Sequence, residues 1–187
     1  MSPAAHKSQL PAEDATAVEP EPAPFNLHVS QQDGDWSGIL GLEPAIRSAA
    51  AALARHPGGC GARHREASIV LGSDDLLRRL NATYRGKDAA TNVLSFPFRP
   101  RATADREADR YLGDVVLAAE TVAREATERQ LEPIEHVQHL VVHGLLHLLG
   151  YDHVTDPDAA EMQRLETEIL TGLGRKDPYA LQLPVEP

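Results

Sequence analysis

The chain has 187 residues, of which 42% are hydrophobic and 25% charged, as is typical of one globular domain with a core of its own. Its single cysteine, Cys60, excludes an internal disulfide and a zinc site built from several thiolates. The formal net charge of −10 disfavours a protein that holds nucleic acid over its whole surface, so a nucleic-acid partner would have to meet a local basic patch.

The two ends of the chain differ in composition from the rest. Residues 1–24 are rich in Pro, Ala and Glu with almost no large apolar side chain, so we expect a disordered tail there. A domain should then occupy 25–174, followed by a loosely ordered tail over 175–187. No segment has the apolar run of a secretory signal or of a membrane span, which predicts a cytoplasmic protein without a membrane partner.

Between these ends, apolar periodicity and turn residues predict alternating strands and helices. In the first half we expect, in chain order, a strand at Asn26–Gln31, a helix at Glu43–Arg55, a strand at Ala67–Leu71 and a helix from the cap Ser73 to about Tyr84. In the second half we expect an edge strand at Asn92–Phe98, a charged loop at Arg99–Arg110, a strand at Gly113–Ala119, and helices at 120–130, 133–149 and 157–171. Four strands among five helices indicate an α+β or mixed α/β layer fold.

The helix predicted at 133–149 carries a stripe of histidines. His136, His139, His143 and His147 are spaced by three, four and four residues, so they fall within one narrow arc of a helix. The other positions of this helix are nearly all apolar, which predicts that it is buried. Buried imidazoles cost free energy unless their ring nitrogens are satisfied, so we expect each of these rings to have a partner.

Three histidines in and after this helix have the spacing of a metal site. His143 and His147 lie one turn apart and can direct ring nitrogens at one ion; Gly150 then ends the helix and His153 returns three residues later. Three nitrogen ligands that leave one position open to water are typical of a catalytic Zn²⁺ site. The alternative is a buried, hydrogen-bonded cluster of histidines.

The remaining histidines of the chain are not expected to bind the metal. His136 and His139 are expected either to support the ligands or to be solvated. Four scattered histidines are expected at the surface, namely His6, His28, His56 and His64.

The H-x3-H-x2-G-x2-H spacing matches that of the metzincin proteases, with one absence. Their general base is a glutamate directly after the first histidine, and here that position is Gly144. Peptide hydrolysis would therefore lack its usual proton acceptor, which leaves a peptidase as the second choice.

A second polar cluster precedes the predicted edge strand. Arg85 and Lys87 surround Gly86 and could hold a phosphate, although the residues alone favour a solvated loop between helix and strand. Several further cations lie nearby in the sequence and could guide single-stranded RNA if they line one cleft: Arg78, Arg79, Arg99 and Arg101. The alternative for Arg78 and Arg79 is a solvated helix face.

Together these motifs resemble the YbeY family of bacterial endoribonucleases. The likeness lies in HGLLHLLGYDH at 143–153, in LNATYRGKDAATNVLSFPF at 80–98 and in LGDV at 112–115, in this order and spacing. Gly144 replaces the protease glutamate in the family too. One departure is Ala90, where the family usually has proline, which should loosen a turn without affecting the chemistry.

The resemblance implies more than the spacing does. It implies an α+β fold with a four-stranded mixed sheet, about five helices, and one metal ion held at the end of a cleft. The ion is taken as Zn²⁺, with other divalent transition metals as alternatives. The resemblance implies single-strand-specific cleavage of RNA, 16S rRNA 3′-end processing and 70S ribosome quality control. The catalytic set would be Arg85, His143, His147 and His153. The implied partners are single-stranded rRNA, the small ribosomal subunit with one of its proteins, and the GTPase Era.

The expected mechanism is metal-assisted cleavage of a phosphodiester, with Arg85 stabilising charge on the phosphate. Asp152 lies beside the ligand His153 and either accepts a proton or orients that ligand. The nucleophile is water or the RNA 2′-hydroxyl. Besides a peptidase, a non-catalytic ribosome-assembly factor with a structural metal remains an alternative.

Overall fold

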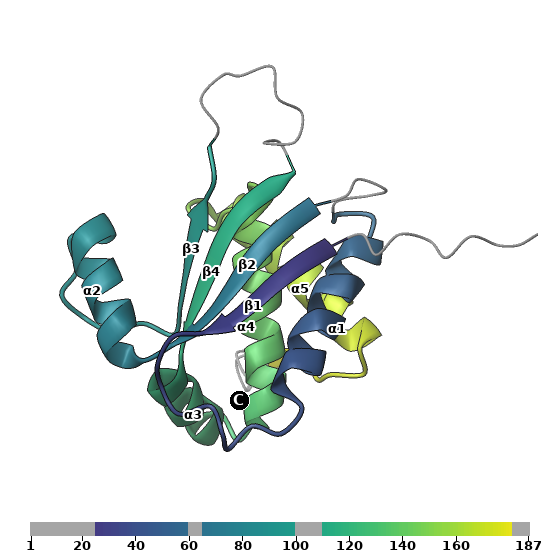
Figure 1. Ribbon diagram of the computed structural model, residues 1–187. Coiled ribbons are helices and arrows are strands. Elements are labelled where there is room, and N and C mark those ends of the chain that lie inside the picture. The colour runs from purple at the N-terminus through teal and green to yellow at the C-terminus, as the bar shows by residue number, and fades with distance from the viewer. Residues whose placement is uncertain (1–24, 60–64, 100–109, 181–187) are drawn as a thin grey trace, which may run out of the picture.

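The computed structural model describes residues 25–59, 65–99 and 110–180. The tail predicted at 1–24 lies outside these residues, as do most of the charged loop over 99–110 and Cys60. The described residues form four strands and five helices (Figure 1), in the order β1 Phe25–Gln31, α1 Leu42–Arg55, β2 Arg65–Gly72, α2 Asp74–Arg85, β3 Val93–Pro97, β4 Tyr111–Ala118, α3 Ala119–Glu128, α4 Pro133–Leu148 and α5 Asp156–Gly172. The predicted elements are confirmed, with bounds that differ by one or two residues.

The four strands make one mixed sheet in the order β1-β2-β4-β3. Strands β1, β2 and β4 are parallel, whereas β3 runs antiparallel to β4 and forms one edge. Pro97 ends this edge strand, where its missing N–H breaks no central ladder. The predicted α+β fold with a four-stranded mixed sheet is thus confirmed.

The two faces of the sheet are covered differently (Figure 1). Strand residues alternate between the faces, so Val115 and Leu117 join the main core with α1, α4 and α5. Val116 and Ala118 point the other way and join a smaller cluster with Leu77 of α2. Helix α4 packs between the sheet and three other helices, α1, α3 and α5, and its buried residues include nearly every apolar position, as the sequence predicts.

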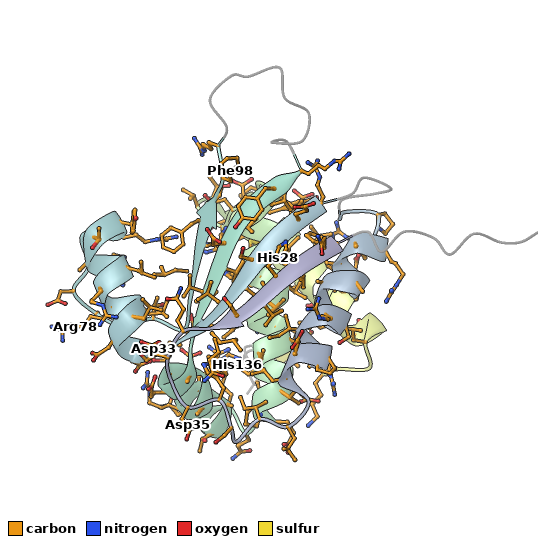
Figure 2. All side chains as sticks on the ribbon, viewed as in Figure 1. His28, Asp33, Asp35, Arg78, Phe98 and His136 are labelled. Carbon is orange, nitrogen blue, oxygen red and sulfur yellow. The ribbon has the colours of Figure 1, made fainter. Side chains whose placement is uncertain are left out.

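The junction from β2 into α2 is held from the loop after β1. Ser73 caps α2, since its side chain accepts a hydrogen bond from the backbone N–H of Leu76, at 3.3 Å. The backbone N–H of Ser73 donates to the side chain of Asp33 at 2.7 Å. Figure 2 labels Asp33 between α2 and the sheet. The buried indole of Trp36 donates to the carbonyl of Gly72 at 3.2 Å, so both loop residues fix the start of α2.

None of the helices in the described part of the chain combines the length and the apolar character that a bilayer span requires.

Candidate metal centre

The turn after α4 brings the three predicted ligands together. Gly150 has a φ of +99°, which a residue without Cβ adopts at little cost, and its N–H donates to the carbonyl of His147 at 3.1 Å. The N–H of Tyr151 donates to the carbonyl of Leu146, also at 3.1 Å. The chain thereby reverses beside its own helix, and one ligand atom each from His143, His147 and His153 lie within 4.8 Å of one another.

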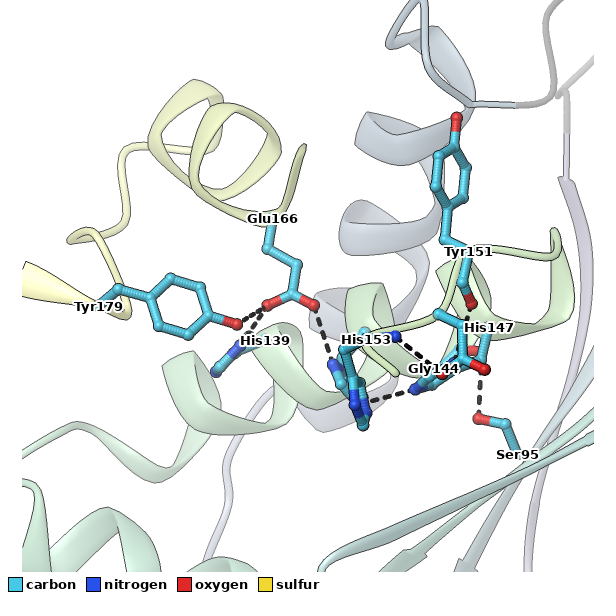
Figure 3. Close-up of polar contacts among 10 residues, drawn as sticks. Ser95, His139, Gly144, His147, Tyr151, His153, Glu166 and Tyr179 are labelled. Carbon is cyan, nitrogen blue, oxygen red and sulfur yellow. Dashed lines mark hydrogen bonds and ion pairs between the residues drawn. The ribbon is translucent and has the colours of Figure 1, made fainter. Parts of the chain in front are cut away.

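The hydrogen bonds of His143 and His147 to Glu166 and to the chain after α4 use the same nitrogen, Nδ1, on both rings. Figure 3 shows the bond between His147 and Tyr151. The Nδ1–H of His143 donates to the carboxylate of Glu166 at 2.8 Å, and the Nδ1–H of His147 donates to the carbonyl of Tyr151 at 3.0 Å. In the neutral ring, the Nε2 of each histidine is then a bare acceptor.

These two acceptors face each other at 3.2 Å, an arrangement that needs a cation between or beside them. Two nitrogen ligands of a tetrahedral zinc ion are expected about 3.3 Å apart. The donor set, its spacing and the fixed tautomers therefore fit an ion of the Zn²⁺ type, with His143, His147 and the more exposed His153 as its ligands.

The buried Glu166 of α5 supports this centre. Its carboxylate accepts from Nδ1 of His143 at 2.8 Å, from Nε2 of His139 at 2.9 Å and from the hydroxyl of Tyr179. Burial alone would raise the pKa of Glu166, but the hydrogen bonds from His139 and His143 outweigh it and lower the pKa to about 2. The ionised carboxylate holds the His143 ring in the orientation and tautomer that binding of a metal requires.

Burial also acts on His147, one of the three predicted ligands. It lowers the pKa of this imidazole, and the neighbouring His143 lowers it further, since two protonated rings would repel each other. A neutral imidazole is the form that binds a metal.

A cavity of about 430 Å³ opens from the three histidines. Its opposite wall is formed by the end of α2 and the loop into β3, including Arg85, Lys87 and Asn92. Arg99 lines an adjoining cavity with His147 and His153. The structure thus places three of the predicted cations around the histidines.

The other predicted cations lie elsewhere. Arg78 is exposed and pairs with Asp88 at 2.6 Å, and Arg79 is exposed on the same helix, so the solvated-face alternative fits both. Arg101 lies outside the described residues.

Asp152 lies beside the ligand His153. Its Oδ1 accepts from the backbone N–H of His153 at 2.8 Å, which fixes the turn that presents this ligand. Asp152 also lines the cavity that contains Arg99. The orienting contact is present, and a role in accepting a proton stays a prediction.

The missing protease glutamate has a steric reason. At Gly144, helix α4 approaches the sheet so closely that a Cβ would lie 2.5 Å from Cγ1 of Val115. The hydroxyl of Ser95 on β3 also donates to the carbonyl of Gly144 at 3.1 Å. The position faces the sheet rather than the cavity, so a glutamate here could not serve as a base without displacing the helix.

The chain matches the family model described as Endoribonuclease YbeY over residues 44–174. It belongs to the YbeY family of endoribonucleases. The resemblance that the histidine and arginine motifs carried is thereby confirmed.

Proteins named Endoribonuclease YbeY are similar to the chain over most of its length. One from Parvibaculum lavamentivorans is 45% identical over 169 residues, covering 86% of this chain and 88% of the relative. Another from Rhizobium meliloti is 44% identical over 165 residues, covering 86% of this chain and 98% of the relative. The solution structure of TM1509 from Thermotoga maritima superposes with a TM-score of 0.53 at 22% identity, covering 87% of this chain and all of that one, so the two share a fold.

In this member of the YbeY family, the sequence alone did not reveal Glu166 and Tyr179. Glu166 interrupts the apolar stripe of α5 between Leu165 and Ile169, and an acid in such a stripe signals a buried partner. Tyr179 comes from the segment predicted as a loose tail, yet residues 175–180 make specific contacts. One of these is a hydrogen bond from Arg175 to Gln138 at 2.7 Å.

The histidines outside the predicted ligand set differ in burial. His139 is buried and supports Glu166, and His136 is buried with its Nε2 bonded to Glu125 at 2.7 Å, so neither is solvated. His28 is exposed as predicted, and His56 is partly exposed, with its ring bonded at 3.1 Å to the surface carboxylate of Glu168. His6 and His64 lie outside the described residues.

Proposed function

We propose that this member of the YbeY family is a single-strand-specific endoribonuclease that uses one Zn²⁺ ion held by His143, His147 and His153. The observation that carries the proposal is the pair of bare Nε2 acceptors 3.2 Å apart, at the end of a cavity whose opposite wall is basic. Three nitrogen ligands leave a coordination position for water or a phosphoryl oxygen.

When bound, a Zn²⁺ ion supplies Lewis acidity and lowers the pKa of a water molecule to about 7. The protein contributes fixed geometry: Glu166 holds His143 and the carbonyl of Tyr151 holds His147, so neither ring has to reorient during the reaction. A nucleophile activated there is the water itself or an RNA 2′-hydroxyl. We propose Asp152, which lines the adjoining cavity, as the group whose carboxylate accepts the released proton.

Arg85 is the residue proposed to hold the scissile phosphate. Within the described residues no hydrogen bond or ion pair engages its guanidinium, whereas Arg78 on the same helix is paired with Asp88. Arg85 also lines both the cavity of the histidines and the adjoining cavity of Arg99. A fork of N–H donors next to a metal centre is suited to a phosphate whose charge grows in the transition state.

The biological setting follows from the family resemblance. We propose 16S rRNA 3′-end maturation and 70S ribosome quality control as the processes, in the cytoplasm. The proposed partners are the small ribosomal subunit with one of its proteins, and the GTPase Era. A negative total charge is compatible with rRNA as substrate because Arg85, Lys87 and Arg99 gather at the site.

The central experiment measures cleavage of a single-stranded rRNA fragment by the purified protein, with bound metal quantified in parallel. His147→Ala should lose both bound zinc and cleavage, and His28→Ala, which changes an exposed histidine on β1, should keep both. Full cleavage by His147→Ala would refute the metal mechanism. Bound zinc without cleavage by the natural protein would favour a non-catalytic assembly factor with a structural metal.

A second pair of variants tests the phosphate site. Arg85→Ala should lower kcat by about 10²–10³, as removal of a donor to a developing oxyanion does, while zinc content stays unchanged. Arg79→Ala removes an exposed arginine from the same helix and should leave the rate within about twofold, since loss of general charge alone costs little at one rim position. An equal loss of kcat in both variants would mean that Arg85 only attracts RNA through its charge and does not hold the scissile phosphate.

A further inference from the structure

A second cavity, of about 610 Å³, adjoins the one that contains the histidines. It lies between α2 and the outer face of β2, β4 and β3, and this volume is within the range of small-molecule sites. Much of its wall is apolar, made by Val70, Leu76, Leu80, Tyr84, Phe96 and Val116. Nothing in the metal chemistry requires an apolar hollow of this size.

The two cavities share part of their walls. Arg85 and Ser95 line both cavities. A nucleoside attached to a phosphate that Arg85 holds next to the histidines would therefore lie at the mouth of the second cavity. An RNA strand that places a phosphate at the metal centre must put the neighbouring base somewhere, and this hollow is directly adjacent.

Tyr84 presents an aromatic surface to that base. It is 68% exposed at the end of α2 and meets Phe96 edge to face, with ring centroids 5.1 Å apart and an angle of 67° between the rings. Such a contact supports the ring while leaving a face uncovered. Exposed aromatic rings beside basic side chains are how proteins hold single-stranded nucleic acid by stacking.

Asp114 on β4 supplies a polar group within the apolar wall. Its Oδ1 accepts a hydrogen bond from the hydroxyl of Tyr111 at 2.6 Å, and that hydroxyl also lies 2.8 Å from the hydroxyl of Ser68. An ionised carboxylate only accepts, so a ligand edge that meets it must donate. The amino group of cytosine donates, whereas the oxygen at the same position of uracil accepts and would be repelled.

We propose that this cavity binds the base next to the phosphate at the metal centre, with Tyr84 against the face of the base and Asp114 accepting from its amino group. The site therefore selects a base with an amino group, cytosine over uracil, at one position of a single-stranded RNA. This inference rests on the proposed function for its ligand class and adds a specificity-determining pocket to it.

The test measures binding rather than cleavage. The zinc-loaded full chain is titrated with fluorescent 2′-O-methyl oligocytidylate or oligouridylate of equal length, each checked to be intact afterwards. The natural protein should bind oligocytidylate about tenfold more tightly, as expected for one hydrogen bond to a charged group. Asp114→Asn should abolish this preference, because an amide can turn to donate or accept.

Two variants at position 84 separate stacking from folding. Tyr84→Leu keeps apolar bulk against Phe96 in a good helix former but has no planar face, so oligocytidylate binding should weaken by about five- to a hundredfold. Tyr84→Phe keeps the face and should bind within about twofold of the natural protein. The unfolding curves of both Tyr84 variants should coincide with that of the natural protein, since Tyr84 is mostly exposed.

If Tyr84→Leu binds oligocytidylate as tightly as the natural protein does, the stacking role of Tyr84 is overturned. If the natural protein binds both oligonucleotides equally, the selection of the amino group by Asp114 is overturned. Absence of binding to either would overturn the whole inference. Because cleavage is measured separately on rRNA, an inactive protein that still prefers oligocytidylate would refute the nuclease proposal and leave the pocket standing.

Discussion

The carboxylate of Glu166 supports the candidate metal centre without being one of its predicted ligands. It is fully buried and accepts from three donors, those of His139, His143 and Tyr179. Glu166→Gln keeps the shape but offers one acceptor oxygen, and its NH₂ group then faces donors. If the oxygen stays with His143, the bonds from His139 and Tyr179 are lost or must reverse.

The magnitude follows from those contacts. A hydrogen bond to a charged group contributes about 1.5–3 kcal/mol, so weakening two of them should lower the free energy of unfolding by about 3 kcal/mol. Loss of a residue that orients a metal ligand typically costs about 10–100-fold in metal affinity, and we expect this range for the zinc Kd.

The assays are urea unfolding and competition for zinc against a chromophoric chelator, both at neutral pH. The matched control is Glu168→Gln on the same helix. That carboxylate is 45% exposed and pairs with Arg164 and His56 at the surface, so its loss should cost at most about 1 kcal/mol and leave zinc affinity unchanged. Zinc binding by Glu166→Gln as tight as that of the natural protein would show that the carboxylate does not orient His143.

Three further predictions concern neighbouring features. Gly144→Ala should lower the free energy of unfolding in urea by about 1–3 kcal/mol, because its Cβ would press on Val115. In the control Gly172→Ala the added carbon meets nothing within 4 Å, so this variant should not be destabilised. Equal effects of the two substitutions would contradict the close approach of Gly144 to the sheet. Tyr179→Phe removes a hydroxyl that donates to the buried carboxylate of Glu166, so it should raise the zinc Kd, but by less than Glu166→Gln does. An unchanged zinc Kd would show that this hydroxyl does not contribute to metal binding. Burial lowers the pKa of His136 from 6.5, so its contribution to stability is complete above pH 6.5 and is lost as pH falls through this value, because the unfolded chain takes up the proton first. His136→Gln should therefore lose less stability on acidification than the natural protein does. Parallel losses of the two proteins, measured by unfolding across this pH range, would refute that assignment.

The sequence predicted the elements well because local signals agreed with tertiary packing. Ser73, Pro133 and Gly150 are start and stop residues whose roles depend on a few neighbouring backbone groups, and all three act in the structure as expected. The three histidines that could hold a metal ion are equally easy to find in the sequence, since His143, His147 and His153 lie within one helix end and its turn.

What the sequence could not predict depends on contacts between distant segments. Glu166 reaches His143 from another helix, and no local spacing specifies that pairing. The second cavity likewise requires Tyr84 of α2 to lie across from Asp114 of β4, which only the strand order places together. The same limit applies to Gly144, whose need for a small residue comes from Val115 on the sheet.

The chain contains a single tryptophan, and its position makes it an optical probe of the cleft wall. The Trp36 indole is 4% exposed and is bonded to the carbonyl of Gly72, directly before the cap of the helix that carries Tyr84 and Arg85. Any displacement of α2 that strains this bond would change the polarity around the only indole, and hence its emission wavelength. Intrinsic fluorescence can therefore follow α2 during RNA binding without an added label.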